Sequence, residues 1–402
     1  MGGSIMASTI NSDTSNGVVV TSDTSGEIEL QSAGVTKAKI TSSGLQNASG
    51  NPITSQAGKN LIINGNMAIA QRATSVTGIT AAGYYTVDRF TYVKTTDDTI
   101  TNEQSTDSPN DAEYSYKITV TTADSTVDGL QFSQIRQVIE GLNTAYLNWG
   151  TANAKTITIS FWVKSSVTGT YCLGLANDSF TRQYIEEYTI VSANTWEKKT
   201  ITITGDTTGT WDTDNTRGII VNWNLACGLD RYGSEGWQTP ASAGNAMATS
   251  NQVNFLGTTS ATFQLALVQL EANTTATPFE HLQYGQQLSL CQRYFQVLSY
   301  VSGTNVAVAM STATDSAITT FYYSQKRATP TVTLPPASKT NGISFLTVTG
   351  AYPGTVGTNT ADRISVTSSR ISGASYVGLA GAGRGAFLYA TGDQVITISA
   401  EL

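Results

Sequence analysis

Asn60-Leu61-Ile62-Ile63-Asn64-Gly65-Asn66-Met67 and, much later in the chain, Val268-Gln269-Leu270-Glu271 running into Ala276-Thr277-Pro278-Phe279-Glu280 are the stretches that decide the fold. Each contains a short apolar run bounded by polar and turn-forming residues, which is typical of a β-strand. We predict that they are the opening and closing strands of one β-sandwich.

The composition favours an all-β fold. Only 13% of the 402 residues are charged, while Thr and Gly are abundant, with 36 Gly, and this mixture favours β-branched strands joined by tight turns. A single hydrophobic core stops growing at about 250 residues, so two or three domains are expected.

Residues 1–58 form the first predicted segment. Short strand-like runs occur at 17–20, 27–30 and 36–41, and in the second run apolar residues alternate with glutamates. The segment has too few large apolar side chains to form a core alone, so we predict that it pairs with another chain and serves in attachment or oligomerisation. The alternative is a linker of Ser, Thr and Gly without a fixed structure.

Residues 59–280 are predicted to form a β-sandwich. Runs in which apolar and polar residues alternate lie at 116–120, 156–163, 188–190, 200–203, 218–223 and 262–270. A weak helical period spans 135–147, where Gly141 limits the helix to one or two turns.

Residues 281–299 are predicted to contain a short connecting helix, because Leu288, Cys291, Tyr294, Phe295 and Leu298 fall on one helical face. Beyond it, residues 300–402 return to the strand-and-turn pattern of a second, smaller β-sandwich. Its expected strands lie at 305–310, 331–334, 344–348, 363–366, 375–379 and 394–400.

Charge and hydropathy exclude several classes of partner. The net charge of -7 and the absence of a basic stripe argue against nucleic-acid binding. No run reaches the roughly 20 apolar residues of a membrane-spanning helix, and the N-terminus lacks the pattern of an export signal. The three cysteines, Cys172, Cys227 and Cys291, fit no zinc or disulfide spacing, so we expect small buried apolar groups.

No catalytic motif stands out, and we predict a protein that is not an enzyme and needs no cofactor. His281 is the only histidine, and no nucleophile elbow accompanies it. The adjacent acids Glu186 and Glu187 would point to opposite faces of a strand, which does not suit the paired carboxylates of a glycosidase. The loop 205–215 offers oxygen ligands but lacks the pattern of an EF-hand, so we predict no metal site and leave structural calcium open.

Aromatic residues in polar loops are the better candidates for a site. Trp and Tyr rings stack on the C–H faces of sugars, while amides, Arg and carboxylates bind the hydroxyls. We predict a glycan-binding groove formed by Trp211, Tyr232, Trp237, Arg231, Asp230 and Asn224. The alternative is that these rings only fill loop edges or a subunit interface.

Longer stretches lie at 83–90 (GYYTVDRF), 138–143 (VIEGLN), 149–156 (WGTANAKT), 160–165 (SFWVKS), 205–211 (GDTTGTW), 290–295 (LCQRYF) and 326–332 (KRATPTV). With the two stretches quoted first, they resemble a family of bacteriophage tail-fibre and minor virion structural proteins. The resemblance implies that 59–280 is a galactose-binding-like jelly roll, similar to carbohydrate-binding modules, and it supplies no catalytic residues. The chain departs from the family pattern at Met67, at Ala70 and in the loop 226–250, so the resemblance does not transfer a ligand.

We therefore expect a virion fibre protein, most simply a tail fibre, that attaches the particle to host cell-surface glycans without cleaving them. Its partners would be other tail or head proteins, and it would assemble in the host cytoplasm as a homotrimer. Two alternatives are a head fibre or capsid decoration protein with a structural role, and a polysaccharide depolymerase.

Overall fold

The computed structural model describes residues 28–32, 35–41, 44–47, 58–242, 244, 246–313, 315–338, 340–347, 357–376, 379 and 383–402. The chain divides into two compact units. One comprises the residues up to Gly58 together with Thr275–Glu280, and the other comprises Lys59–Thr274 together with His281–Leu402. Almost all regular structure is β-strand, which confirms the predicted all-β fold.

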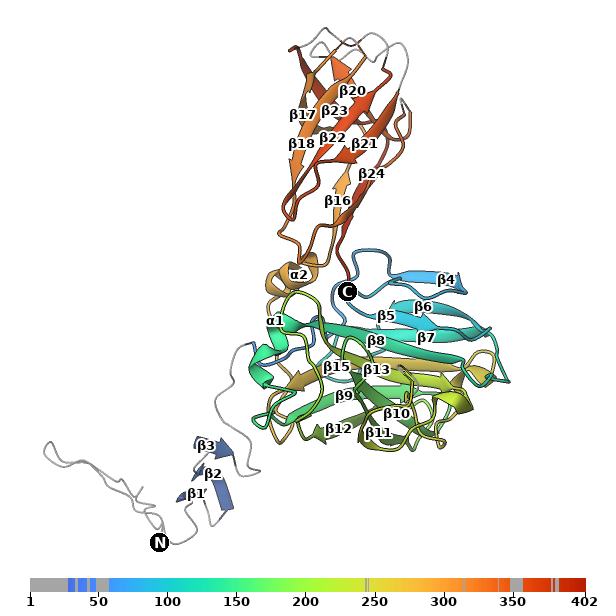
Figure 1. Ribbon diagram of the computed structural model, residues 1–402, viewed down its shortest axis with the longest axis vertical. Coiled ribbons are helices and arrows are strands. Elements are labelled where there is room, and N and C mark those ends of the chain that lie inside the picture. The colour runs from blue at the N-terminus through green and yellow to red at the C-terminus, as the bar shows by residue number, and fades with distance from the viewer. Residues whose placement is uncertain are drawn as a thin grey trace, which may run out of the picture. The chain divides into compact units, whose positions relative to one another are not determined.

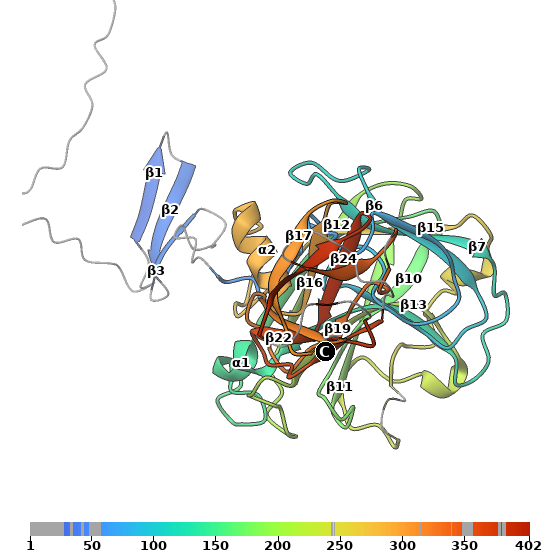
Figure 2. The same cartoon turned by 90° about the horizontal axis from the view of Figure 1, so that it is seen from above.

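The first unit contains a small antiparallel meander of β1 (Ile28–Ser32), β2 (Val35–Thr41) and β3 (Gly44–Asn47), seen side by side in Figure 2. The predicted strands at 27–30 and 36–41 are β1 and β2, whereas the one at 17–20 lies outside the described residues. Leu30, Val35 and Ile40 are 43–55% exposed. A three-stranded sheet with such exposed apolar side chains buries little hydrophobic surface.

Residues 59–274 form a sandwich of two six-stranded sheets (Figure 1). The first sheet has the order β12-β9-β15-β7-β6-β4, and the second has the order β14-β11-β10-β13-β8-β5. The strands are β4 (Ser75–Ile79), β5 (Thr91–Lys94), β6 (Thr99–Ser105), β7 (Ser115–Thr122), β8 (Phe132–Glu140), β9 (Ile157–Ser165), β10 (Gly169–Ala176), β11 (Gln183–Ile190), β12 (Glu197–Ile203), β13 (Arg217–Cys227), β14 (Gly236–Gln238) and β15 (Thr262–Glu271).

Eight of these strands form nested antiparallel pairs: β7 with β15, β8 with β13, β9 with β12, and β10 with β11. Successive pairs in this nest fall alternately in the first and the second sheet. A long hairpin rolled up in this way is a jelly roll. The topology therefore agrees with the jelly roll that the sequence resemblance implied.

The two sheets bury their inner faces against each other. In β7, Tyr116, Ile118 and Val120 alternate with more exposed residues and enter the main core. Trp223 of β13 is fully buried near the core centre, with its ring centroid 6.0 Å from that of Phe161 in β9. Each buried aromatic side chain removes about 150–250 Å² from water, so these rings provide much of the hydrophobic stabilisation.

The predicted opening strand at 60–67 is wrong, because these residues form a turn. Asn64 and Met67 have positive φ angles of 62° and 60°, which interrupt an extended chain. The Asn60 side chain instead accepts the Leu270 N–H at 3.0 Å and donates to the Val268 carbonyl at 3.0 Å, so the turn lies along β15. The closing strand is confirmed for 268–271, whereas 276–280 is irregular.

The helical signal at 135–147 is correct only in its second half. Residues 135–140 belong to β8, and helical turns begin at Gly141 with α1 (Gly141–Thr144) and continue in η1 (Ala145–Leu147). Ile135 faces the core between the sheets, while Val138 packs in a separate cluster on the outer face. Burial on both faces removes the alternation that would have marked a strand.

The connecting helix is α2 (Tyr284–Gln292), which begins with a capping box formed by Gln283 and Gln286. Sequence periodicity placed Phe295 and Leu298 on this helix, but both lie in the next strand, β16 (Phe295–Tyr300). The predicted helix is therefore present but ends earlier than the apolar spacing indicated.

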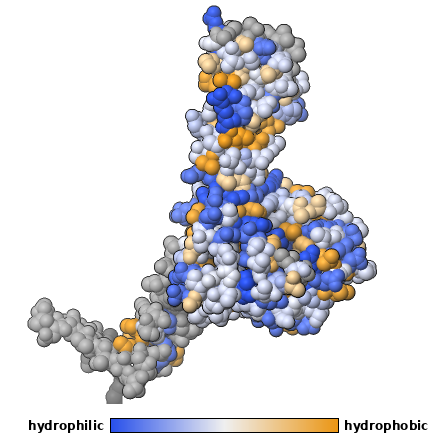
Figure 3. Space-filling view, viewed as in Figure 1, coloured by the Kyte–Doolittle hydropathy of each residue, from blue (hydrophilic) through white to orange (hydrophobic). Residues whose placement is uncertain are grey.

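The C-terminal part is a second, smaller sandwich with a three-stranded sheet, β16-β24-β19, and a six-stranded sheet, β20-β23-β17-β18-β22-β21. Its other strands are β17 (Asn305–Ser311), β18 (Ala317–Tyr322), β19 (Thr331–Thr333), β20 (Ile343–Thr347), β21 (Thr358–Asp362), β22 (Ser368–Ala374), β23 (Gly385–Ala390) and β24 (Gln394–Ser399). Phe345, Tyr376, Leu388 and Ile396 are among its buried core residues. Figure 3 shows apolar side chains on the surfaces of both sandwiches, interspersed with polar regions.

Two strands predicted in this sandwich are not formed. Residues 363–366 are a loop, and Arg363 at its start has a φ of 45°. Of the stretch 375–379, the described residues 375, 376 and 379 are not in a strand, and Ser375 has a φ of 63°. All three cysteines are buried and free, as expected. No helix in the described part of the chain is both long and apolar enough to cross a membrane.

A buried glutamate, Glu140 at the end of β8, links the two sandwiches. Its carboxylate accepts hydrogen bonds from Arg293 Nε at 2.8 Å and Nη2 at 2.5 Å, and from the Tyr294 hydroxyl at 2.8 Å. Because Arg293 and Tyr294 lie between α2 and β16, this contact fixes the start of the C-terminal sandwich against the jelly roll.

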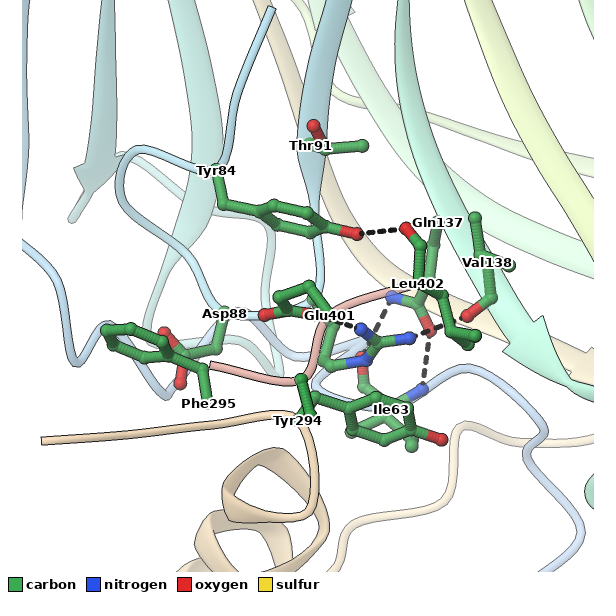
Figure 4. A network of polar contacts seen from close by, with 12 residues as sticks. Ile63, Tyr84, Asp88, Thr91, Gln137, Val138, Tyr294, Phe295, Glu401 and Leu402 are labelled. Carbon is green, nitrogen blue, oxygen red and sulfur yellow. Dashed lines mark hydrogen bonds and ion pairs between the residues drawn. The ribbon is translucent and has the colours of Figure 1, made fainter. Parts of the chain in front are cut away.

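The last two residues make a second link (Figure 4). The Glu401 carboxylate pairs with Arg89, and with Arg72 at 3.0 Å. The Arg89 guanidinium is buried, donates to the Val138 carbonyl at 2.7 Å and lies 3.5 Å from the Tyr294 ring centroid. Charged groups this deeply buried are tolerated because each one has an opposite charge or a carbonyl beside it.

Asp88 lies at this joint, and burial raises its pKa to about 6 although Gln71 and Arg72 bind its carboxylate. An unfolded Asp titrates near 3.9, so the folded protein holds the proton more tightly. The free energy of unfolding should therefore fall as pH rises from about 4 to about 6, by up to about 3 kcal/mol from this group.

Asp88→Asn should remove that contribution. Because other carboxylates titrate in the same region, the quantity to measure is the difference between wild type and variant in urea unfolding at pH 4 to 8. A difference that stays constant over this range would contradict the assignment.

Candidate functional site

Three tryptophans gather at one edge of the jelly roll. Trp149 follows η1, Trp211 lies in the loop before β13, and Trp237 lies in β14. Their ring centroids are 4.8 Å apart for Trp149 and Trp211, 5.3 Å for Trp149 and Trp237, and 5.6 Å for Trp211 and Trp237, all nearly edge to face. Edge-to-face pairs of this kind are favourable in addition to the area they bury.

Each indole N–H in this cluster donates to a backbone carbonyl. Trp149 donates to Lys155 at 2.8 Å, Trp211 to Thr208 at 3.2 Å, and Trp237 to Thr204 at 2.7 Å. The rings are thus fixed, and a ligand could use their apolar surfaces but not their N–H groups.

The loop GDTTGTW at 205–211 is shaped to hold Trp211 in this cluster. Gly205 approaches the Lys155 carbonyl so closely that a Cβ atom would clash, and Gly209 has a φ of 77° beside the Arg182 side chain. Asp206 is almost fully buried and receives two hydrogen bonds from Arg182, at 2.7 and 2.9 Å. This carboxylate is therefore occupied by an arginine.

A pocket of about 160 Å³ opens beside Trp149 and Trp211. Its apolar lining consists of the two tryptophans with Ala145, Leu147 and Ile219, and the other lining residues are polar. The lining residues are Thr144, Ala145, Leu147, Asn148, Trp149, Thr151, Trp211, Asp212, Thr213 and Ile219. Mixed walls of this kind, with aromatic surface and a few polar groups, are typical of small-molecule sites.

Two polar residues of the lining have distinctive environments. Asn148 is exposed, and its backbone adopts the left-handed conformation, with φ 55° and ψ 29°. Asn tolerates this conformation better than most residues. Burial raises the pKa of Asp212, and the neighbouring carboxylates Asp178 and Asp214 raise it further. The pocket thus offers one amide and one carboxylate to hydroxyl groups.

The six residues predicted for a glycan groove do not all meet. Trp211 and Trp237 come together, and Trp211 lines the pocket, whereas Asn224, Asp230, Arg231 and Tyr232 do not line it. Trp211 is 9% exposed and belongs to the main core, so part of its role is to fill the loop edge, as the alternative interpretation proposed.

The other four predicted residues lie near the loop that follows β13. Asn224 is fully buried and donates to the Cys172 and Met247 carbonyls at 3.1 and 2.7 Å. Arg231 donates to the Leu130 and Gly244 carbonyls at 2.9 and 2.8 Å. Asp230 and Tyr232 are exposed on either side of it, at η2 (Leu229–Arg231).

Sequence reasoning missed Trp149 and Asn148 as site residues. The signal available in the sequence was the run Asn148-Trp149-Gly150, because Asn and Gly are the residue types that most readily adopt positive φ. Both residues do so in the structure. Two left-handed residues around a tryptophan indicate a tight turn that presents the ring. The sequence does not show that this turn meets Trp211, because that contact depends on the loop at 205–211.

The two adjacent acids Glu186 and Glu187 lie outside the pocket lining and are engaged with protein groups. Glu186 accepts from the Tyr184 hydroxyl at 2.6 Å, while Glu187 accepts from Asn251 at 3.0 Å. Within the described ranges, no three His, Cys, Asp or Glu side chains are grouped to hold a metal ion.

No protein-family model matches the sequence, and no curated protein matches it. Solved structures are similar to part of the chain, and three of them are described here. The C-terminal family 22 carbohydrate-binding module of Clostridium thermocellum Xyn10B is 10% identical with a TM-score of 0.29, over 55% of this chain and 100% of that one. The enzymatically active domain of bacteriophage CBA120 tailspike protein 4 is 12% identical with a TM-score of 0.27, over 54% of this chain and 22% of that one.

The third is a family 11 carbohydrate-binding module from Clostridium thermocellum, in complex with a β-1,3-1,4-mixed-linked tetrasaccharide. It is 11% identical with a TM-score of 0.26, over 50% of this chain and 98% of that one. At these identities and TM-scores, the likenesses carry no functional conclusion for this chain.

Because Trp211 packs in the core, Trp211→Ala should lower the free energy of unfolding by about 3 to 5 kcal/mol. Tyr232→Ala truncates an aromatic side chain that is 38% exposed, so it should lower the free energy of unfolding by less than about 1 kcal/mol. Urea unfolding of both variants checks this. Equal stability losses would show that Trp211 is not a core residue in solution.

Proposed function

We propose that this chain is a bacteriophage virion fibre protein that binds host cell-surface glycans without cleaving them, and that the pocket beside Trp149 and Trp211 is its sugar site. The observation that carries the proposal is that two tryptophans line the pocket together with hydroxyl, amide and carboxylate side chains. The virion role rests on the sequence resemblance to tail-fibre and minor virion proteins.

The pocket chemistry suits a sugar. Trp149 and Trp211 are each more than nine-tenths buried, and the surface that they retain borders the pocket. A sugar C–H face would contact this surface, while Asn148, Thr213 and Asp212 would bind hydroxyl groups. Rings already fixed by packing and hydrogen bonds lose little entropy when a ligand binds.

The same pocket favours binding over hydrolysis. Glycosidases place two carboxyl groups about 5 to 9 Å apart across the scissile bond. Asp212 is the one acid among the residues that line this pocket. The neighbouring acids Asp178 and Asp214 are outside the lining and are engaged with Arg217 and Thr216. The lining therefore offers one carboxylate to hydroxyl groups and no acid and base pair.

The N-terminal unit favours an oligomer. Its described strands leave Leu30, Val35 and Ile40 largely exposed, and burying them against equivalent strands of other copies would supply the missing hydrophobic contact. We propose a homotrimer, in which three weak sugar sites would gain avidity through their high effective concentration.

Asn148→Gly should weaken glycan binding by about 2- to 10-fold, because it removes one amide that contributes about 0.5 to 1.5 kcal/mol. Glycine keeps the left-handed backbone of this position without strain. The measurement is titration calorimetry with an oligosaccharide identified on an array of bacterial surface glycans.

Asn153→Gly is the matched control, since Asn153 is exposed in the same loop but outside the pocket lining. The control should bind like the wild type. Unchanged affinity of Asn148→Gly would exclude the pocket as the sugar site, and release of reducing ends from the glycan would favour a depolymerase instead.

Sedimentation equilibrium should give three times the 42.5 kDa mass of one chain for the full-length protein, and one chain mass for a protein that begins at Lys59. The reason is that the exposed apolar strands lie in the part removed. A monomeric full-length protein, or a trimer that survives the truncation, would contradict the assigned role of the N-terminal unit.

A further inference from the structure

The loop that supplies Asp212 and Thr213 to the pocket is attached to the C-terminal sandwich. Asn215, in the same loop, exchanges two hydrogen bonds with Arg327, which lies before β19. The Asn215 side chain donates to the Arg327 carbonyl at 2.7 Å, and Arg327 Nη1 donates to the Asn215 carbonyl at 2.9 Å. This reciprocal pair fixes the backbone of the loop against a residue of the other sandwich.

The other side of the pocket is anchored at the same joint. Most of the lining residues lie within 144–151, in and after the helical turns of α1 and η1. These turns directly follow Glu140, whose carboxylate accepts hydrogen bonds from Arg293 and Tyr294 at the start of the C-terminal sandwich. Both segments that line the pocket are therefore attached, a few residues away, to the joint between the two sandwiches.

Backbone contacts also connect the two sides of the pocket to each other. The Gly141 N–H donates to the Thr216 carbonyl at 2.9 Å, and the Leu142 N–H donates to the Asp214 carbonyl at 2.7 Å. A Cβ atom at Gly141 would lie 2.4 Å from the Asp212 carbonyl oxygen, so only glycine allows this approach. A displacement of one side at the joint would thus be passed to the other.

Arg327 is the residue at which these attachments meet. Its backbone N–H donates to the Arg293 carbonyl at 3.1 Å. Its Nε donates to the Ala400 carbonyl at 2.6 Å, and its Nη2 donates to the Glu401 carbonyl at 2.8 Å. Since Nη1 binds Asn215, each of the three guanidinium nitrogens holds a different carbonyl, one from the pocket loop and two from the C-terminal end of the second sandwich.

We propose that Arg327 is a positioning residue for the sugar pocket, and that the pocket and the joint are coupled through it. While the joint is formed, Asn215 is held and the loop places Asp212 and Thr213 in the lining. When the joint opens, the loop 212–216 is released and the pocket loses that side. A sugar that contacts this loop would bind the joined state more tightly, and by linkage it would strengthen the joint by the same factor. The inference rests on the proposed glycan binding and adds the regulation of that site.

The first test is the affinity of the full chain, by titration calorimetry, for the same array oligosaccharide that is titrated against Asn148→Gly. Asn215→Ala should weaken binding about 2- to 10-fold, the range that one hydrogen bond supplies. Arg327→Gln should weaken it at least as much. Neither residue lines the pocket, so these losses would report positioning. Arg370→Gln is the matched control, because Arg370 pairs with Asp362 within the same sandwich at 2.6 Å, and it should bind like the wild type.

The second test is hydrogen exchange at the joint, which a purely structural role would not link to the sugar. The Ala400 N–H donates to the Tyr294 carbonyl at 2.7 Å, and neither residue lines the pocket. Saturation with the oligosaccharide should slow exchange about 2- to 10-fold in the peptide that ends at Leu402, measured by mass spectrometry. The slowing should be smaller in Asn215→Ala. Exchange in β20, which pairs within the C-terminal sandwich, should not change.

Wild-type affinity in both Asn215→Ala and Arg327→Gln would overturn the proposal. So would weakened binding without any effect of the sugar on exchange at Ala400, because Arg327 would then support the fold without coupling the two sites. Failure of the proposed function would be seen separately, as wild-type affinity of Asn148→Gly.

Discussion

The structure depends on one constraint, which is that the two sheets of the jelly roll must bury their inner faces against each other. Strands that are far apart in sequence, such as β7 and β15, become neighbours because the nested pairing closes this core. The inner faces are therefore filled by Trp223, Phe161 and other apolar side chains. The pocket lies outside this core, beside Trp149 and Trp211.

Much of this fold could be predicted from alternation of apolar and polar residues. The stretches 116–120, 156–163 and 262–270 lie in β7, β9 and β15, because one face of each enters the core while the other stays more polar. The errors have local causes. Met67, Arg363 and Ser375 adopt positive φ, which neither their type nor their neighbours announce. Asn64 also does so, and here the dipeptide Asn64-Gly65 was a turn signal that the apolar run before it outweighed. Residues 135–140 are buried on both faces, which hides the strand period.

The candidate site was predictable only in part. Trp211 and Trp237 could be selected as aromatics in polar loops, and they do meet. Trp149 escaped selection because its contact with them depends on the conformation of 205–211, which is held by the Arg182 and Asp206 pair and by Gly209. Asn224 was predicted because amides bind sugar hydroxyls, but its side-chain amide is buried and donates hydrogen bonds to the Cys172 and Met247 carbonyls. Residue type indicates what a side chain can bind, whereas tertiary packing decides what it does bind.

The double link between the sandwiches has a mechanical consequence. The C-terminal sandwich is held to the jelly roll both through Arg293 and Tyr294, which follow α2, and through Glu401, which follows β24. Since β16 and β24 are paired neighbours, tension applied to this sandwich divides between two parallel anchors instead of passing through a single covalent strand. Two attachment points also resist twisting about the connection, so torque on one sandwich would be transmitted to the other.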